Sequence, residues 1–184
     1  MKRISRRKLA ALALGATLAI LGWSDPFLAR KSAPPRAQNI RQQDDRYHEV
    51  VKVVDGDTID VRVGDATERV RMLGIDTPET VDPRRTVQCF GREASDKTRS
   101  LLAGAKVRLE SDPTQADRDR YGRLLRYVSA EEGTDINLQL ISKGFAHEYT
   151  FSVPYERQAR YRAAEQEART AARGLWAPGV CDRK

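Results

Sequence analysis

Apolar and polar residues alternate over several short runs of the chain. In residues 58–63, every second position is Ile or Val and the positions between them carry Asp or Arg, which is the pattern of a half-buried β-strand. β-Branched residues also dominate residues 48–54, and residues 69–75 form a third run. Turn residues separate the runs, first at 55–57 and then at 64–65. The pattern predicts a meander of three strands that curls into an antiparallel sheet.

The rest of the chain adds two strands and three helices. The patterns predict strands at 106–110 and 123–128, and helices at 91–102 and 137–143. A last helix is predicted from Ser152, as N-cap with Pro154 in the first turn, to Arg173. The order of these elements predicts an α+β domain, built on a small five-stranded barrel with three helices.

The first 24 residues have the pattern of a secretory leader. A basic segment precedes 15 uncharged, mostly apolar residues, Leu9 to Trp23. That run is shorter than the roughly 20 residues of a membrane-spanning helix. Residues 1–24 are therefore predicted to be a signal peptide or N-terminal anchor, residues 25–46 a linker, and residues 47–180 the folded domain. The protein is expected to be exported, whether periplasmic, secreted or anchored, and to contact a membrane only if the leader is uncleaved.

The net charge of the chain does not identify a partner. The total of +7 would favour binding to polyanions. However, residues 1–46 hold 10 basic and 3 acidic residues, whereas residues 47–184 hold 23 of each. The predicted domain is neutral, so any affinity for nucleic acid depends on where its charges lie.

Two cysteines occur in the chain, Cys89 and Cys181. In an exported protein such a pair favours one disulfide, which would tie a loop to the C-terminal tail. The alternative is two unpaired, small apolar side chains. Their spacing matches no metal-binding pattern.

Polar residues gather where the predicted strands end. The segments are Asp55-Gly56-Asp57-Thr58, Arg71-x4-Asp76-Thr77-Pro78-Glu79 and Asp119-Arg120-Tyr121-Gly122-Arg123. Each of them, taken alone, could be a simple turn or a solvent-exposed strand end. A curled meander can bring the first two together, and Asp57, Asp76 and Thr77 would then form an oxygen-only shell suited to Ca²⁺. The absence of His and Cys from these segments argues against zinc.

Two arginines and a glutamate would complete a site for phosphodiester hydrolysis. Arg71 and Arg123 could each be a solvated strand residue. At the rim of one site, however, they would hold a phosphodiester and stabilise the extra charge of a pentacoordinate phosphorane. Glu79 would orient or deprotonate the attacking water.

With these motifs the sequence resembles the thermonuclease family, whose best known member is staphylococcal nuclease. The similarity extends from about Val51 to Trp176, and the three polar segments and a G-x-E-A-S segment at Gly91–Ser95 occur in the order of the family. The resemblance implies an OB-fold barrel with three helices. It also implies a calcium-dependent endonuclease that cleaves DNA and RNA and leaves 3′-phosphate ends.

The resemblance carries residue roles as well. By position, Asp57, Asp76 and Thr77 match the calcium ligands of the family, and the catalytic residues match Arg71, Glu79 and Arg123. Arg120 and Tyr121 match positions that contact the phosphate of the nucleotide, although the staphylococcal form has Lys in the first of them.

The segment after Gly144 departs from the staphylococcal form, in which an aromatic residue stacks on the base. Tyr149 is the expected counterpart, and Tyr155 is the second candidate. His48 and His147 lie outside all the motifs and are expected to be structural.

Two other functions remain open. One is a non-catalytic OB-fold module that binds nucleic acid or a protein, and the other is an exported domain that calcium merely stabilises. Degenerate modules usually lose the acidic or arginine positions, and here all six are filled, so the sequence favours the enzyme. DNA and RNA are the expected partners, and no obligate protein partner is predicted.

Overall fold

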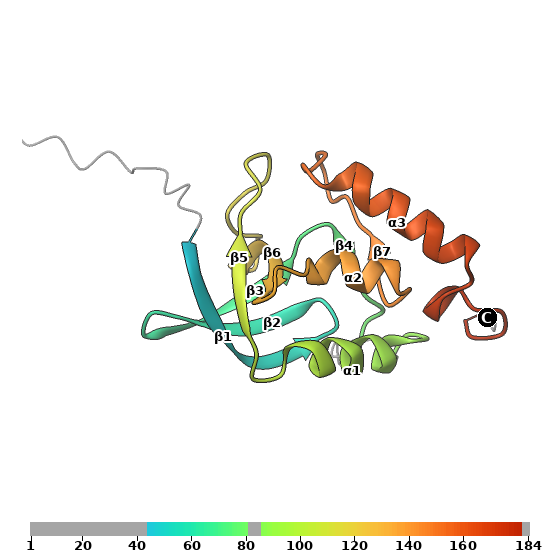
Figure 1. Ribbon diagram of the computed structural model, residues 1–184, viewed down its shortest axis with the longest axis horizontal. Helices are drawn as coiled ribbons and strands as arrows, with labels where there is room; N and C mark the ends of the chain where they lie inside the picture. The colour runs from blue at the N-terminus through green and yellow to red at the C-terminus, as the bar shows by residue number, and fades with distance from the viewer. Residues whose placement is uncertain (1–43, 81–85, 182–184) are drawn as a thin grey trace, which may run out of the picture. The chain divides into compact units, whose positions relative to one another are not determined.

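The computed structural model describes residues 44–80 and 86–181, whose elements Figure 1 shows. The barrel strands are β1 (Asp44–Asp55), β2 (Thr58–Val63), β3 (Ala66–Met72), β5 (Lys106–Glu110) and β6 (Leu124–Ala130). They close in the order β1-β2-β3-β6-β5. β3 and β6 pair in parallel, whereas the other neighbouring pairs, β1–β2, β2–β3, β1–β5 and β5–β6, are antiparallel. The predicted leader at 1–24 and most of the predicted linker lie outside the described residues.

Three helices and a small second sheet accompany the barrel. The helices are α1 (Gly91–Leu102), α2 (Ile136–Ser142) and α3 (Gln158–Thr170), followed by the 3-10 helix η1 (Gly174–Trp176). The second sheet pairs β4 (Ile75–Asp76) with β7 (His147–Glu148). α2 contacts β6, α1 and α3 (Figure 1). The predicted α+β fold, a five-stranded OB-fold barrel with three helices, is confirmed.

The core consists of alternate strand residues together with one face of each helix. On β3, Val70 and Met72 are buried in the core, whereas Arg69 and Arg71 lie on the other face of the strand. Tyr161 of α3 is fully buried and packs edge-on against Tyr127 of β6, with ring centroids 6.1 Å apart. Each large apolar side chain buried in this way contributes about 1.5–3 kcal/mol. The barrel face that carries arginines is therefore fixed by the apolar face opposite it.

The last helix begins later than the sequence predicts. α3 starts at Gln158 with Arg157 in the N-cap position, so the prediction of Ser152 as N-cap and Pro154 in the first turn is wrong. The Pro154 carbonyl accepts hydrogen bonds from the side chains of Thr114 and Gln115. This loop is held by tertiary contacts, which capping signals in the sequence do not reveal.

Several strand boundaries also differ from those predicted. β1 begins at Asp44, inside the predicted linker, because its backbone pairs with β5 and places Asp44 opposite Leu109. The predicted run 69–75 is split, since β3 ends at Met72 and β4 pairs with β7 instead. Within the described ranges, the helices are too short or too polar to cross a membrane.

Candidate active site

The turn between β1 and β2 packs tightly against the segment that follows β4. A Cβ at Gly56 would lie 2.7 Å from the Thr77 hydroxyl, so a larger residue would push the two segments apart. The Thr98 hydroxyl of α1 donates to the Gly56 carbonyl at 2.6 Å. Helix α1 therefore holds the turn in place. The two carboxylates of the turn, Asp55 and Asp57, are buried.

Asp57 lies at the centre of a cluster of polar side chains. Its Oδ2 accepts hydrogen bonds from the backbone N–H of Thr77 at 2.9 Å and from the Thr77 hydroxyl at 3.1 Å. Its Oδ1 accepts from the Thr58 hydroxyl at 2.9 Å. Nη2 of Arg71 lies 3.1 Å from Asp57 Oδ2 and 2.8 Å from Asp76 Oδ1. The structure thus brings together Asp57, Asp76, Thr77 and Arg71, as the meander predicts.

The Arg71 guanidinium is held on two sides. While Nη2 contacts the carboxylates, Nη1 donates to the carbonyls of Met72 at 3.0 Å and Ile75 at 2.8 Å. The side chain is only 13% exposed. A planar guanidinium has enough donors in fixed directions to make all these contacts, whereas an ammonium group does not.

Arg123 reaches the same face of the barrel from the neighbouring strand. β3 and β6 are parallel, with Val70 opposite Leu124 and Arg71 opposite Leu125. Val70 and Leu124 are buried, so alternation places Arg123 on the outer face with Arg71. Nε of Arg123 donates to Asp119 Oδ2 at 2.6 Å, which orients its guanidinium.

The carboxylates of this cluster carry more negative charge than its arginine offsets. Burial raises the pKa of Asp55 above its usual value, and the charges of Asp57 and Glu79 raise it further. Hydrogen bonds from Thr80 and Gly56 lower this pKa, but by less than burial raises it. Partial burial likewise raises the pKa of Asp76, because the Arg71 guanidinium only partly offsets it. Glu79 is thus within electrostatic range of both. We call Asp55, Asp57, Arg71, Asp76, Thr77 and Glu79 the polar cluster.

A cavity of about 570 Å³ opens beside the polar cluster. Its lining includes Arg71, Asp76 and Arg123, together with Arg120, Tyr121 and Tyr149. The predicted catalytic arginines therefore share one cavity with the predicted substrate-binding residues.

Exposed rings line the outer part of this cavity. Tyr121, Tyr149 and Phe151, which we call the aromatic wall, are 67%, 43% and 76% exposed. Tyr155 is only 6% exposed, and its hydroxyl donates to the Gly74 carbonyl at 3.1 Å, so it is the less suitable of the two stacking candidates. Phe151 was not predicted. Its spacing of two residues from Tyr149 was the available signal, because such residues share a side of an extended chain.

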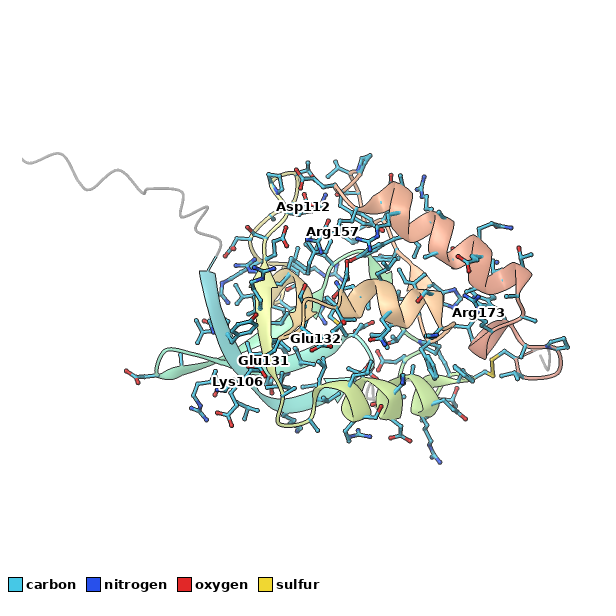
Figure 2. The ribbon with its side chains drawn as sticks, viewed as in Figure 1. Lys106, Asp112, Glu131, Glu132, Arg157 and Arg173 are labelled. Carbon is cyan, nitrogen blue, oxygen red and sulfur yellow. A yellow bond between two sulfur atoms is a disulfide. The ribbon has the colours of Figure 1, made fainter. Side chains whose placement is uncertain are left out.

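A polar network holds the loops that carry the cavity walls. Asp112 Oδ2 accepts from the Tyr127 hydroxyl at 2.5 Å and from the backbone N–H of Glu156 at 2.8 Å. Arg157 lies over the Tyr127 ring at 4.0 Å and bonds to Asp135 at 3.2 Å, and Figure 2 shows Asp112 and Arg157 on the α3 side of the barrel. Burial alone would raise the pKa of Asp112, but hydrogen bonds from Thr114, Tyr127 and Glu156 hold it below its usual value.

Apart from Arg71, the side chains of the polar cluster offer only oxygen atoms as possible ligands for a metal ion. Within residues 44–80 and 86–181, no three side chains of the His, Cys, Asp and Glu types gather as ligands for a metal ion. A cation beside Asp57 and Asp76 would take its other ligands from Thr77, water or substrate. Two carboxylates with hydroxyl and carbonyl oxygens fit a hard cation such as Ca²⁺ rather than zinc.

Cys89 and Cys181 form a disulfide, 92 residues apart in the chain. Cys89 precedes α1, and Cys181 follows η1.

The two histidines lie outside the polar cluster. His48 is buried on β1, with Nδ1 3.1 Å from the Arg62 carbonyl. His147 contacts the Trp176 ring edge-on and lies 3.5 Å from Glu165.

Known proteins resemble this chain over most of its length. A family model described as staphylococcal nuclease homologue matches residues 69–178. A thermonuclease of Staphylococcus hyicus is 36% identical over 158 residues, which cover 86% of this chain and 91% of that protein. A thermonuclease of Staphylococcus intermedius is 36% identical over 69% of this chain and 74% of its own length. The endonuclease YncB of Bacillus subtilis is 36% identical over 68% of this chain and 59% of its own length.

The barrel, the arginine-lined cavity and these relatives define a nuclease, a hydrolase of the phosphodiester bonds of nucleic acids. The chain belongs to the staphylococcal nuclease family.

Proposed function

We propose that this nuclease is a calcium-dependent endonuclease that cleaves DNA and RNA and leaves 3′-phosphate ends. One observation carries the proposal: Arg71, Asp76 and Arg123 line a single cavity, where Arg71 contacts Asp57 and Asp76 lies within electrostatic range of Glu79. Two guanidinium groups and a carboxylate-rich edge are what an anionic phosphodiester and a bridging cation need together.

Asp57, Asp76 and Thr77 are the proposed calcium ligands. Their oxygens suit Ca²⁺, which takes roughly six to eight oxygen ligands in irregular geometry. Burial raises the pKa values of Asp55 and Asp76, and a cation bound beside them would offset the cost of burying their charged carboxylates. Calcium held there would supply positive charge that polarises a phosphoryl oxygen.

Arg71 and Arg123 are the proposed phosphate clamps. Their guanidiniums reach the cavity from β3 and from the residue before β6, and they would hold two phosphoryl oxygens as charge grows on them. Glu79 would accept a proton from water or orient it for in-line attack on phosphorus, opposite the 5′ oxygen. The bond between phosphorus and the 5′ oxygen then breaks, that oxygen takes up a proton from solvent, and the phosphate stays on the 3′ side.

Arg120, Tyr121 and Tyr149 are proposed to bind the rest of the nucleotide. Arg120 lies 4.7 Å from the centre of the Tyr121 ring and donates to its hydroxyl at 2.6 Å, so both side chains present one surface to the cavity. Stacking and backbone contacts of this kind do not depend on a 2′-hydroxyl, which supports action on DNA and RNA alike.

The purified protein should be incubated with single-stranded DNA, and separately with RNA, in calcium and in excess chelator. We expect cleavage in calcium that stops in chelator and that falls by about 100-fold or more in Glu79→Gln. End-labelling should find the new phosphate on the 3′ ends. Binding without cleavage by the unaltered protein would instead support a non-catalytic OB-fold module.

We also propose that the protein is exported. A basic segment and a 15-residue apolar run open the sequence, and a disulfide such as Cys89–Cys181 is typical of proteins outside the cytosol. Cell fractionation with mass measurement should find the protein outside the cytoplasm, either lacking its leader or anchored by it. Recovery of the full-length chain in the cytoplasm would contradict the proposal.

A further inference from the structure

The backbone of Glu79 is hydrogen-bonded on both sides by one residue. The Glu79 N–H donates to the side-chain Oε1 of Gln88 at 2.9 Å, and the Gln88 N–H donates to the Glu79 carbonyl at 3.0 Å. The Gln88 side chain itself is exposed. The pair fixes the peptide groups before and after the Glu79 side chain.

The turn that carries Gln88 also packs against the Glu79 backbone. A Cβ at Gly91 would lie 3.0 Å from the Pro78 carbonyl and 3.1 Å from the Glu79 carbonyl. The Gly91 N–H donates to the Gln88 carbonyl at 3.0 Å, which closes the turn at the start of α1. The first residue of α1 thus approaches the Glu79 segment as closely as a glycine allows.

Two further contacts hold this turn. Phe90 has a left-handed backbone with φ of 66°, a conformation that is strained for a residue other than glycine. Its ring packs on Phe145 at 5.4 Å between centroids. Cys89 is bonded to Cys181, so the tail after η1 is joined to the residue next to Gln88. A strained conformation persists only where its surroundings fix it, and here a ring contact and a covalent bond do so.

We propose that Gln88 is a positioning residue for Glu79, and that the turn 88–91, held by the Cys89–Cys181 bond, is the clamp through which it acts. The inference rests on the proposed role of Glu79 in orienting or deprotonating water. A displacement of about 1 Å in a reacting group can cost roughly 100-fold in rate, so fixing the backbone at Glu79 matters for turnover more than for substrate binding.

The test compares Gln88→Met and Gln88→Glu in the full-length, disulfide-bonded protein. Met has similar length but no acceptor for the Glu79 N–H, whereas Glu keeps an acceptor oxygen. For Gln88→Met, kcat should fall about 10- to 100-fold while KM stays within about twofold. Gln88→Glu should recover most of the loss. Gln166→Met, on the exposed face of α3, is the matched control and should leave both constants unchanged.

A double-mutant cycle separates this inference from the proposed function. If Gln88 acts through Glu79, adding Gln88→Met to Glu79→Gln should cause no further loss in kcat. An unchanged kcat in Gln88→Met, or the same fold loss with and without Glu79, would overturn the positioning role. A Glu79→Gln protein of normal kcat would instead overturn the proposed role of Glu79. Thermal unfolding of each variant shows whether the fold is intact.

Discussion

The polar cluster and the aromatic wall border the same cavity but are built in opposite ways. In the polar cluster, the side chains of Asp57 and Arg71 are 8% and 13% exposed, and each is held by several partners. In the aromatic wall, Tyr121 and Phe151 are 67% and 76% exposed and lie on loops. Fixed charge therefore lies where a phosphate would react, and adaptable surface lies where a base would bind.

The two regions also differ in how their carboxylates are satisfied. Burial raises the pKa values of Asp55 and Asp76 in the polar cluster. Behind the aromatic wall, hydrogen bonds outweigh burial and lower the pKa values of Asp112 and Asp119. Burial of the charged carboxylates in the first set costs stability, whereas the hydrogen bonds of the second set stabilise the loops. The contrast suggests that turnover and affinity can be changed separately.

The largest effect is expected from Arg71→Lys. Lysine cannot contact Asp57, Asp76 and two carbonyls at once, so kcat should fall about 100- to 1000-fold with little change in KM. Steady-state kinetics on a short oligonucleotide would measure this. Arg69→Lys is the control, because Arg69 lies on the same strand face, is half exposed and pairs with Asp60. An equal loss in Arg69→Lys would mean that the charge of the whole face matters, and not the geometry at Arg71.

A smaller effect is expected from truncation of the aromatic wall. Tyr149→Ala and Phe151→Ala should each raise KM about 5- to 100-fold, since a stacked base contributes about 1–3 kcal/mol, while kcat stays within about twofold. Tyr47→Ala removes an exposed ring on β1 and should change neither constant. If kcat falls and KM does not rise, then the aromatic wall does not act on affinity alone, and the proposed division between turnover and affinity is wrong.

The smallest effect is expected on the melting temperature when the pH is lowered. The pKa of Asp112 is lowered in the folded protein, so its stabilising contribution is complete above the unfolded value of about 3.9 and is lost as the pH falls through the lower folded value. The melting temperature should therefore fall with acid in this window, and less steeply in Asp112→Asn. Parallel slopes for the two proteins would show that Asp112 does not carry this dependence.

Much of the fold could be predicted because periodicity reports burial directly. The strand at 58–63 and the helix at 91–102 have the predicted bounds, since their apolar positions repeat with the period of the element. The start of α3 could not be predicted, because the loop at Ser152 and Pro154 is held by Thr114 and Gln115 from a distant part of the chain. Such contacts leave no local pattern.

The candidate site likewise has residues whose placement could be predicted from the sequence and residues whose placement could not. That Asp57, Asp76, Thr77 and Arg71 meet was predicted from strand ends in a curled meander, which is a matter of topology. The contact between Gln88 and Glu79 could not be predicted. A glutamine in a loop belongs to no catalytic motif, and this one bonds to the backbone N–H and carbonyl of Glu79. The only sequence signal for Phe151 is its spacing of two residues from Tyr149, and so short a signal does not stand out in an irregular loop.

The disulfide also constrains the order in which the domain can be completed during synthesis. Cys89 is made 92 residues before Cys181, and β5, β6, α2 and α3 all lie between them. The native bond therefore cannot close until all of these elements have been made, by which time the barrel strands are all available to pair. The Glu79 segment would consequently receive its covalent support last, so a newly made chain is expected to gain its fold before its full rate of turnover.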